Sequence, residues 1–557
     1  MAKQFAAQSC KITLVSLCMF SLAGVPPITA SSPMDPPTKP RWPRQRSWMA
    51  AKTRWPTRAM LQTGVINHRA GLGNMPETIP PEHLGKPGYE AHLNNRVVTI
   101  ADQLRAGGYR TYLTGKWHLG HTPDTLPTAR GYDHALALAQ SGADNFEDKP
   151  NLLIYDKTEW SDDGKPAKLP KRFYSSTLII DKMIGYIDRG RASGKPFLAS
   201  VNFIANHIPV QARDADIAAY AGRYNAGWTA LRKERRSATI AKSVMPAGVA
   251  MVTMGTSGDW SKLSAEQKRQ RAGAMAAYAA MGTAMDREIG RLIAHLKSIG
   301  AYENTIFVFL SDNGAEATDP MNMGAFTRWN ANHLYDQSIA QQGRPGSLTA
   351  QGAGFASASA SPLRGYKFTA NEGGLRVPMI IAWPGTLKPA TTSDAMVCWP
   401  DLLPTFIELG GGTVPEGIDG RSFVGILLGT TTTHRDQVFT THSGDGDFNV
   451  YPIRSVRTRD WKYIRNLHPE FQHHSHISRS TGPSGLMYWK TWLTAAEKDP
   501  AAAATVQRFT TRPAEELYDL ANDPNELHNL AADPKQSDRL AALRAELDAW
   551  MKEQGDT

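Results

Sequence analysis

A lysine and a histidine stand close together on one short turn of the sequence. Residues 115–120 read Gly-Lys-Trp-His-Leu-Gly and follow a short predicted strand, so Lys116 and His118 leave its end two residues apart. In extended backbone, side chains two residues apart project to the same side. A cation and an imidazole in this arrangement can bind an anion and transfer a proton. Taken alone, the turn also suits a surface lysine and a packed histidine.

Two further cationic turns repeat this theme. His207 stands in Asn-His-Ile-Pro, just after the predicted strand 197–203, where proline fixes the turn. Lys367 ends Leu-Arg-Gly-Tyr-Lys and precedes the predicted strand 377–383. Each residue alone would usually be structural, but three cationic turns next to strands favour an anion-binding site.

An aspartate and an asparagine add hard oxygen atoms to this set. Asp312 and Asn313 follow the buried predicted strand 305–310 and precede Gly314. Open α/β sheets bind ligands at the carboxyl ends of their strands, and carboxylate and amide oxygens suit Ca²⁺, or Mg²⁺ in its place. Asp-Asn-Gly is also a common turn sequence. Together with the cationic turns, however, the pair favours an anion site that contains a divalent cation.

The elements that must position these residues alternate between helices and strands. A helix is predicted over 94–104, and a longer one begins at Ser264 with Gln267 as its capping-box partner. The longer helix ends near Gly300, and the strand 305–310 follows at once. This alternation predicts the α/β class, with a large doubly wound, mostly parallel sheet flanked by helices.

Three segments are expected after residue 30. Residues 31–53 are rich in proline and arginine and predict an irregular segment that cannot be a central strand. The α/β domain is expected over 54–430. A smaller C-terminal α+β domain is expected over 431–557, which contains strand-like runs and ends in an amphipathic helix.

Residues 1–30 carry the signs of an export leader. Lys3 and Lys11 precede an apolar run, and small residues near Ala30 offer a cleavage point. The run is too short to span a bilayer, and no later stretch reaches the roughly 18 apolar residues of a spanning helix. We therefore expect a signal peptide and an exported protein, periplasmic or secreted, with no stable membrane span.

The net charge of +10 is unevenly distributed. Nine basic residues and a single acid, Asp35, fall in the first 60 positions, which therefore carry +8 of that charge. The rest of the chain is close to neutral and predicts no nucleic-acid partner. Cys10 and Cys18 lie in the expected leader, so Cys398 would remain alone and no internal disulfide could form.

Several ordered motifs from about residue 54 to the C-terminus resemble those of the bacterial arylsulfatases. These enzymes belong to the type I, formylglycine-dependent sulfatase family of the alkaline phosphatase superfamily. The motifs are Arg-Ala-Met-Leu-Gln-Thr-Gly at 58–64, Gly-Tyr-Arg-Thr at 108–111 with Gly-Lys-Trp-His at 115–118, Arg-Gly-Tyr-Asp at 130–133, the block 363–378, and Glu-Leu-Tyr-Asp-Leu at 516–520 with Asp-Pro at 523–524.

The resemblance implies a role for each candidate residue. The groups that would hold the sulfate and assist departure of the alcohol are Lys116, His118, His207 and Lys367. Asp312 and Asn313 match the calcium ligands of the family, and Arg58 would orient the nucleophile. That nucleophile is a formylglycine, which a formylglycine-generating enzyme makes from the cysteine of Cys-x-Pro-x-Arg.

Two departures from the family pattern concern activity. Arg54 stands where the resemblance places the cysteine, and an arginine cannot become formylglycine or act as a nucleophile. The family also opens with a buried strand that ends in two aspartates, its other calcium ligands. The sequence predicts neither that strand nor that pair, since Asp35 stands alone.

The predicted function is that of a sulfuric ester hydrolase. It would cleave an aryl or other small-molecule sulfate monoester to an alcohol and sulfate, although the chain lacks the residue that would become the nucleophile. One alternative is a phosphodiesterase or phosphonate hydrolase of the same superfamily. Another is a non-catalytic protein that binds sulfate esters through its cationic turns.

Overall fold

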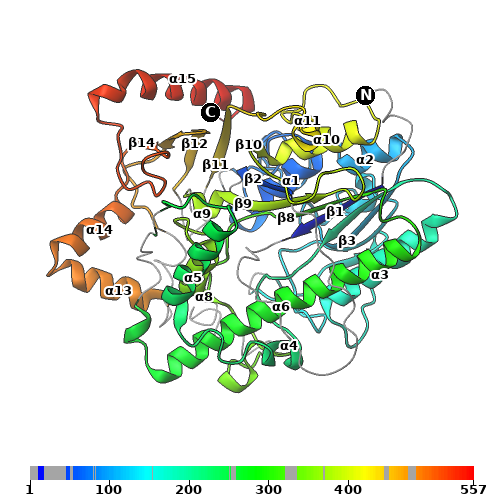
Figure 1. The fold of residues 1–557 in the computed structure, drawn as a ribbon, viewed down its shortest axis with the longest axis horizontal. Coiled ribbons are helices and arrows are strands. Elements are labelled where there is room, and N and C mark those ends of the chain that lie inside the picture. Colours follow the sequence, from blue (N-terminus) through cyan, green and yellow to red (C-terminus); the bar gives the residue numbers. More distant parts are fainter. Residues whose placement is uncertain are drawn as a thin grey trace.

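The larger part of the molecule is a ten-stranded mixed sheet with helices on both faces (Figure 1). The computed structural model describes residues 11–17, 45–50, 54–79, 81, 83–152, 155–249, 251, 259–319, 335–367, 371–443, 451–474 and 485–556. In spatial order the strands are β10 (Thr392–Cys398), β2 (Gln45–Ala50), β9 (Arg376–Ala382), β8 (Thr305–Ser311), β1 (Lys11–Leu17), β7 (Phe197–Asn202), β3 (Arg110–Lys116), β4 (His134–Leu138), β5 (Trp160–Asp162) and β6 (Lys165–Pro166). The predicted α/β class is confirmed.

The centre of the sheet is parallel. Strands β8, β1, β7, β3 and β4 run in one direction, whereas β9 on one side and β5 on the other are antiparallel to their neighbours. The carboxyl ends of parallel strands lie along one edge of a sheet. The loops that follow β8, β7 and β3 therefore leave the sheet along the same edge.

Strand β1 is a difference from the sequence expectation. Lys11–Leu17 lies between β7 and β8 and pairs with both in parallel. The sequence predicted no N-terminal strand, and the structure corrects that expectation. The leader over residues 1–30 stays a prediction. A strand buried on both faces and the apolar core of a leader are both continuous apolar runs, so periodicity cannot separate them.

Strand β2 corrects the expectation of an irregular segment at 31–53. Gln45–Ala50 begins after the last proline of that segment, Pro43, and pairs with β9 and β10. Proline disfavours a strand only where it stands, so this argument could not exclude a strand at residues 45–50. Residues 18–44, which hold the remainder of the proline-rich stretch, lie outside the described residues.

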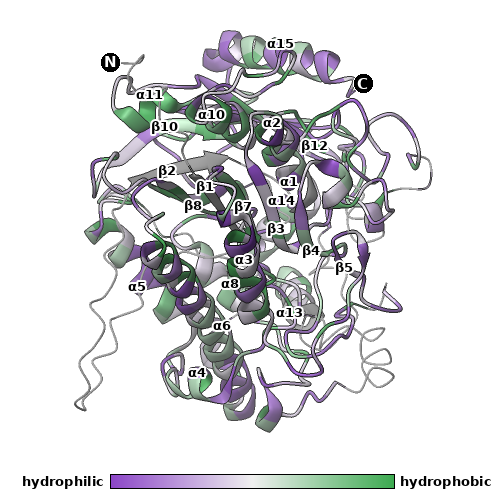
Figure 2. Cartoon of the chain, turned by 90° about the vertical axis from the view of Figure 1, so that its right-hand side faces the viewer, coloured by the Kyte–Doolittle hydropathy of each residue, from purple (hydrophilic) through white to green (hydrophobic). Residues whose placement is uncertain are grey.

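Two layers of helices cover the sheet, as Figures 1 and 2 show. Each layer closes an apolar core, one on each face. The first layer contains α3 (Ser175–Arg191) and α6 (Ala265–Ser298), and the opposite layer contains α1 (Arg54–Thr63), α2 (Ile100–Ala106), α10 (Leu402–Leu409) and α11 (Val424–Leu428). Shorter helices that accompany them are α4 (Asp214–Ala218), α5 (Gly227–Ala241), α8 (Gly352–Ala360) and α9 (Glu372–Leu375).

Local signals set the ends of two helices. The predicted capping box before α6 is present, because Ser264 Oγ accepts a hydrogen bond from Gln267 N at 3.1 Å and the Gln267 side chain accepts from Ser264 N. Helix α2 is shorter than the predicted 94–104. Thr99 caps it through a box with Asp102, so the helix begins at Ile100.

A second, antiparallel sheet follows the first along the chain. It consists of β11 (Gln437–His442), β12 (Ile453–Thr458), β13 (Trp461–Asn466) and β14 (Glu515–Asp519). Helix α15 (Ser537–Gln554) packs on it, and α13 (Gly485–Ala496) and α14 (Pro500–Thr510) lie between β13 and β14 in the sequence.

The C-terminal tail connects the smaller and the larger domain through a buried cluster of Asp556, Arg454 and His68. Both oxygens of Asp556 accept hydrogen bonds from Arg454 on β12, and Oδ1 lies 3.7 Å from His68 Nε2 in the larger domain. Burial lowers the pKa of His68 from 6.5 to about 4, against the opposing effect of Asp556. His68 is therefore neutral in the folded protein at neutral pH.

This cluster predicts a loss of stability in mild acid. Below the unfolded pKa of 6.5, His68 gains a proton when the chain unfolds, so its contribution to stability is complete above that pH and falls toward pH 4. Between about pH 7 and pH 5, the free energy of unfolding should fall by about 2 kcal/mol through this residue. Urea unfolding of the native chain and of His68→Gln at pH 7 and at pH 5 measures this loss in the free energy of unfolding. An equal loss in the two proteins would contradict the assignment.

Candidate active site

Arg58 connects two of the predicted site segments at the carboxyl edge of the central sheet. Its Nη1 donates a hydrogen bond to Lys116 O at 3.1 Å, and its Nε lies 3.2 Å from Asp312 Oδ2. Both partners of this ion pair are buried. Helix α1 and the ends of β3 and β8 therefore meet at one guanidinium group.

The end of β3 packs closely against β7. Gly115 has φ +95°, and a Cβ atom there would lie 2.0 Å from Asn202 O, so only glycine fits. Lys116 follows with a fully buried side chain. His118 has φ 60°, which is a left-handed conformation. The backbone is therefore not extended at His118, and the argument that extended backbone places Lys116 and His118 on the same side does not apply there.

A glutamate and a tyrosine hold the imidazole of His118. Its Nε2 lies 3.1 Å from Glu77 Oε1, and since a carboxylate only accepts, Nε2 carries the hydrogen. Tyr155 donates its hydroxyl hydrogen to the same Glu77 oxygen. Burial and the charge of Glu77 raise the pKa of Tyr155, so the phenol keeps its proton. Glu77 thus fixes both the orientation and the tautomer of His118.

His207 is held in a similar way by a backbone carbonyl. It is buried, and its Nδ1 lies 2.7 Å from Ile208 O, so Nδ1 donates and Nε2 is the acceptor of the neutral ring. Asn151 donates to the same carbonyl at 2.7 Å. A Cβ at Gly142 would lie 3.1 Å from His207 Nδ1, so this glycine lets the 141–145 loop approach the ring.

Lys367 lies against the loop that carries Asp312. Its backbone N donates to Ala315 O at 3.1 Å, and its buried ammonium pairs with Glu316. The two loops approach closely, because a Cβ at Gly314 would lie 2.2 Å from Gly373 O. The turn of Lys367 and the Asp-Asn pair therefore lie side by side, although Lys367 comes 54 positions after Asn313 in the sequence.

The second sheet fixes the segment that follows Lys367. Lys462 on β13 is fully buried, with its Nζ 2.6 Å from Glu526 Oε1 and 3.8 Å from Glu372 Oε1. Burial alone would raise the pKa of Glu372, but Arg457 and Lys462 outweigh it and lower the pKa to about 2. The smaller domain thus contributes to the site indirectly, by anchoring α9.

Asp312 and Asn313 fit part of a cation site. Asn313 Oδ1 is buried and accepts no hydrogen bond from the described residues, as expected of an oxygen kept for a cation. Ca²⁺ takes six to eight oxygens, and the described part of the chain holds no group of three His, Cys, Asp or Glu placed to bind a metal. Cys18 and Met19, which follow β1 in the sequence, lie outside the described residues and offer no carboxylate. Among the described residues, the ligand set is therefore incomplete.

The structure brings some of the predicted site residues into contact with one another and not others. Arg58, the backbone of Lys116 and Asp312 are in direct contact, and Lys367 joins them through the neighbouring loop. His118 and His207 are held by their own local partners. The side chain of Arg54 lies outside the described atoms, although Arg54 itself begins α1.

Sequence reasoning missed the carboxylates among these cations. Glu77 and Glu316 contact His118 and Lys367, and neither belongs to a motif that suggested chemistry. The available signal for Glu316 was its place four residues after Asp312, at the end of the same strand. No comparable signal marked Glu77, whose partner is 41 residues away.

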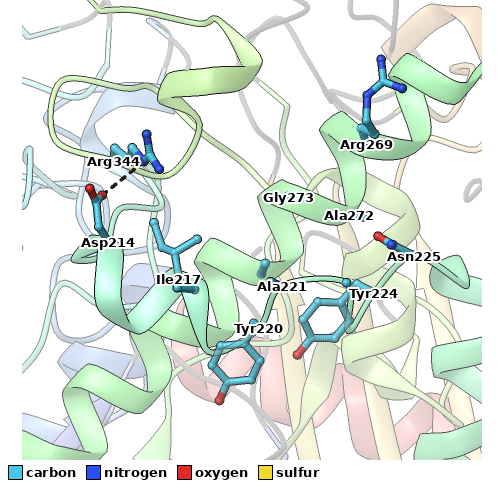
Figure 3. A pocket seen from close by; sticks show the side chains of 13 residues that line it. Asp214, Ile217, Tyr220, Ala221, Tyr224, Asn225, Arg269, Ala272, Gly273 and Arg344 are labelled. Carbon is cyan, nitrogen blue, oxygen red and sulfur yellow. Dashed lines mark ion pairs between the residues drawn. The ribbon is translucent and has the colours of Figure 1, made fainter.

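A surface cavity of about 270 Å³ lies elsewhere, between α4 and α6 (Figure 3). Tyr220 and Tyr224 line it, and Arg344 pairs with Asp214 across 3.2 Å at one side. None of the predicted site residues lines this cavity. It is therefore separate from the carboxyl edge of the sheet. Within the described residues, no helix is long and apolar enough to cross a membrane.

Comparisons with known proteins agree with this arrangement. A crystal structure of Ps i-CgsB superposes with a TM-score of 0.60 at 20% sequence identity, covering 98% of this chain and 93% of that one. A protein solved in complex with its substrate D-glucosamine-2-N,6-O-disulfate gives a TM-score of 0.56 at 19% identity, covering 92% of each chain. At these identities, the likeness concerns the fold.

Sequence comparisons carry the assignment further. An uncharacterised sulfatase of Schizosaccharomyces pombe is 35% identical over 433 residues, which cover 73% of this chain and 76% of the relative. An arylsulfatase of Klebsiella aerogenes is 33% identical over 360 residues, which cover 64% and 76%. A model for the C-terminal region of N-sulphoglucosamine sulphohydrolase matches residues 366–484, and the sulfatase family model matches residues 51–412. The chain therefore belongs to the sulfatase family, whose members are sulfuric ester hydrolases of the alkaline phosphatase superfamily.

Proposed function

We propose that the carboxyl edge of the central sheet binds the SO₃ group of a sulfate monoester. The observation that carries this proposal is the contact of Arg58 with both the Lys116 segment and Asp312, beside the loop of Lys367. Lys116, Lys367 and His207 would bind the sulfate oxygens. In a hydrolytic member of the family with this arrangement, the residue at His118 would move a proton and the residue at Arg58 would position the nucleophile.

The chemistry of a sulfate ester requires this composition. Its sulfur is shielded by negative oxygens, so a site must concentrate positive charge around it and supply a proton to the departing alcohol. Buried lysines supply that charge strongly because little water screens it. Imidazoles can exchange a proton near neutral pH, and Glu77 would keep His118 in one orientation while it does so.

Two groups typical of the family are incomplete in this chain. A divalent cation would be held by Asp312 and Asn313 and would add positive charge beside the sulfate. The described residues offer it no group of three His, Cys, Asp or Glu ligands, so water would fill much of its shell. A formylglycine supplies the attacking oxygen in the family and cannot form at Arg54. We therefore propose that the chain binds sulfate esters without hydrolysing them.

Titration calorimetry tests this proposal. We expect p-nitrophenyl sulfate to bind the native chain, and Lys116→Gln and Lys367→Gln each to weaken it, because each removes one buried cation from the anion site. Bis-p-nitrophenyl phosphate serves as the comparison ligand. Tighter binding of this diester would favour the phosphodiesterase alternative. If the protein folds cooperatively but neither ligand gives a heat of binding, the proposal of an anion site is refuted.

A further inference from the structure

Lys367 has a carboxylate partner inside the proposed anion site. Its ammonium group pairs with Glu316 Oε2, and both side chains are largely buried, at 1% and 10% exposure. Glu316 Oε1 accepts from Thr318 N at 3.0 Å and from Thr318 Oγ1 at 2.6 Å. Gln351 donates to the backbone oxygen of Glu316 at 2.9 Å. Hydrogen bonds therefore hold both the carboxylate and the backbone oxygen of Glu316 in place. They disfavour rotation of the carboxylate away from Lys367 when an anion enters.

Carboxylates also accompany the other cations of this edge. Asp312 lies against Arg58, and Glu77 against His118. Arg58, His118 and Lys367 therefore each have a carboxylate partner in the folded protein. An anion that binds there must compete with an internal carboxylate for Lys367 and is repelled by it.

We propose that Glu316 determines which anions the site accepts, by disfavouring inorganic sulfate relative to sulfate monoesters. This inference rests on the proposed function. A sulfate monoester carries one negative charge, whereas free sulfate carries two, so repulsion from a fixed carboxylate acts about twice as strongly on the dianion. Desolvated charges amplify this difference because the surroundings screen them poorly. In an active relative of this geometry, the same carboxylate would help to expel the sulfate product.

Binding of two anions to Glu316→Gln tests this inference. Calorimetry at neutral pH would use sodium sulfate and p-nitrophenyl sulfate with the native chain, Glu316→Gln and Lys367→Gln. We expect Glu316→Gln to bind sulfate about tenfold more tightly and the monoester about threefold more tightly, so the preference for the monoester narrows. Lys367→Gln should weaken both ligands. Exposed Glu546 on α15 gives the matched control, since Glu546→Gln removes the same charge far from the carboxyl edge.

Each outcome has a defined meaning. If Glu316→Gln weakens both anions, or changes both equally, Glu316 only supports the loop and the inference is wrong. Thermal melts of the variant and the native chain separate that result from loss of folding. If neither anion binds either protein, the proposed function fails, and this inference fails with it. Binding of both anions with an unchanged ratio refutes this inference alone.

Discussion

Removal of residues 1–30 is expected to leave a protein that aggregates and does not melt cooperatively. Strand β1 pairs with β7 at five positions and with β8 at seven, in the middle of the ten-stranded sheet. Without it, two long strand edges face each other across a gap, and unpaired edges promote aggregation. Net folding stability is about 5 to 15 kcal/mol, which the loss of a central strand would exceed. Circular dichroism melts and light scattering measure the result.

A shorter deletion provides the control. Removing residues 1–8 leaves Lys11–Leu17 in place and should preserve the melting temperature. A leader cleaved near Ala30 and a central strand at this segment cannot belong to the same mature molecule. If the chain without residues 1–30 melts cooperatively at the native temperature, the leader interpretation is right and β1 is not part of the mature sheet.

The native chain is expected to leave p-nitrophenyl sulfate intact, and Arg54→Cys to restore turnover. The substitution recreates Cys-x-Pro-x-Arg at 54–58, which a co-expressed formylglycine-generating enzyme would recognise. The permanently protonated guanidinium of Arg54 cannot attack sulfur. Removal of a catalytic nucleophile costs on the order of 10⁶ in kcat, as in subtilisin, so the difference should be large.

Mass spectrometry of the peptide that contains Pro56 gives a readout besides activity. It should show Arg54 in the native chain and an aldehyde in the variant. Arg54→Ala, expressed with the same modifying enzyme, is the matched control. Turnover by the native chain, or an aldehyde in the variant without turnover above Arg54→Ala, would show that the missing nucleophile is not the limiting loss.

Local signals account for most of what the sequence predicted correctly. The capping box of Ser264 and Gln267, the helix it begins and the strand after it depend on contacts within a few residues. The same holds for Asp312 and Lys116 at strand ends, since a buried strand and the glycine after it mark such positions. The parallel centre of the sheet followed from the alternation of helices and strands.

Local signals did not determine the structure of the N-terminal segment. An apolar run of this length is consistent with a leader and with a buried strand, and its partners, β7 and β8, lie about 190 and 290 residues further along the chain. Likewise, residues 45–50 became a strand only because β9 and β10 provide edges for them.

The sequence by itself therefore determined the fold class, the family and the set of cations that could bind an anion. The tertiary structure alone decided which carboxylates stand among those cations, with Glu316 on Lys367, Glu77 on His118 and Asp312 on Arg58. Local periodicity reports burial and secondary structure, whereas the charge of a site depends on side chains that meet only after the chain has folded.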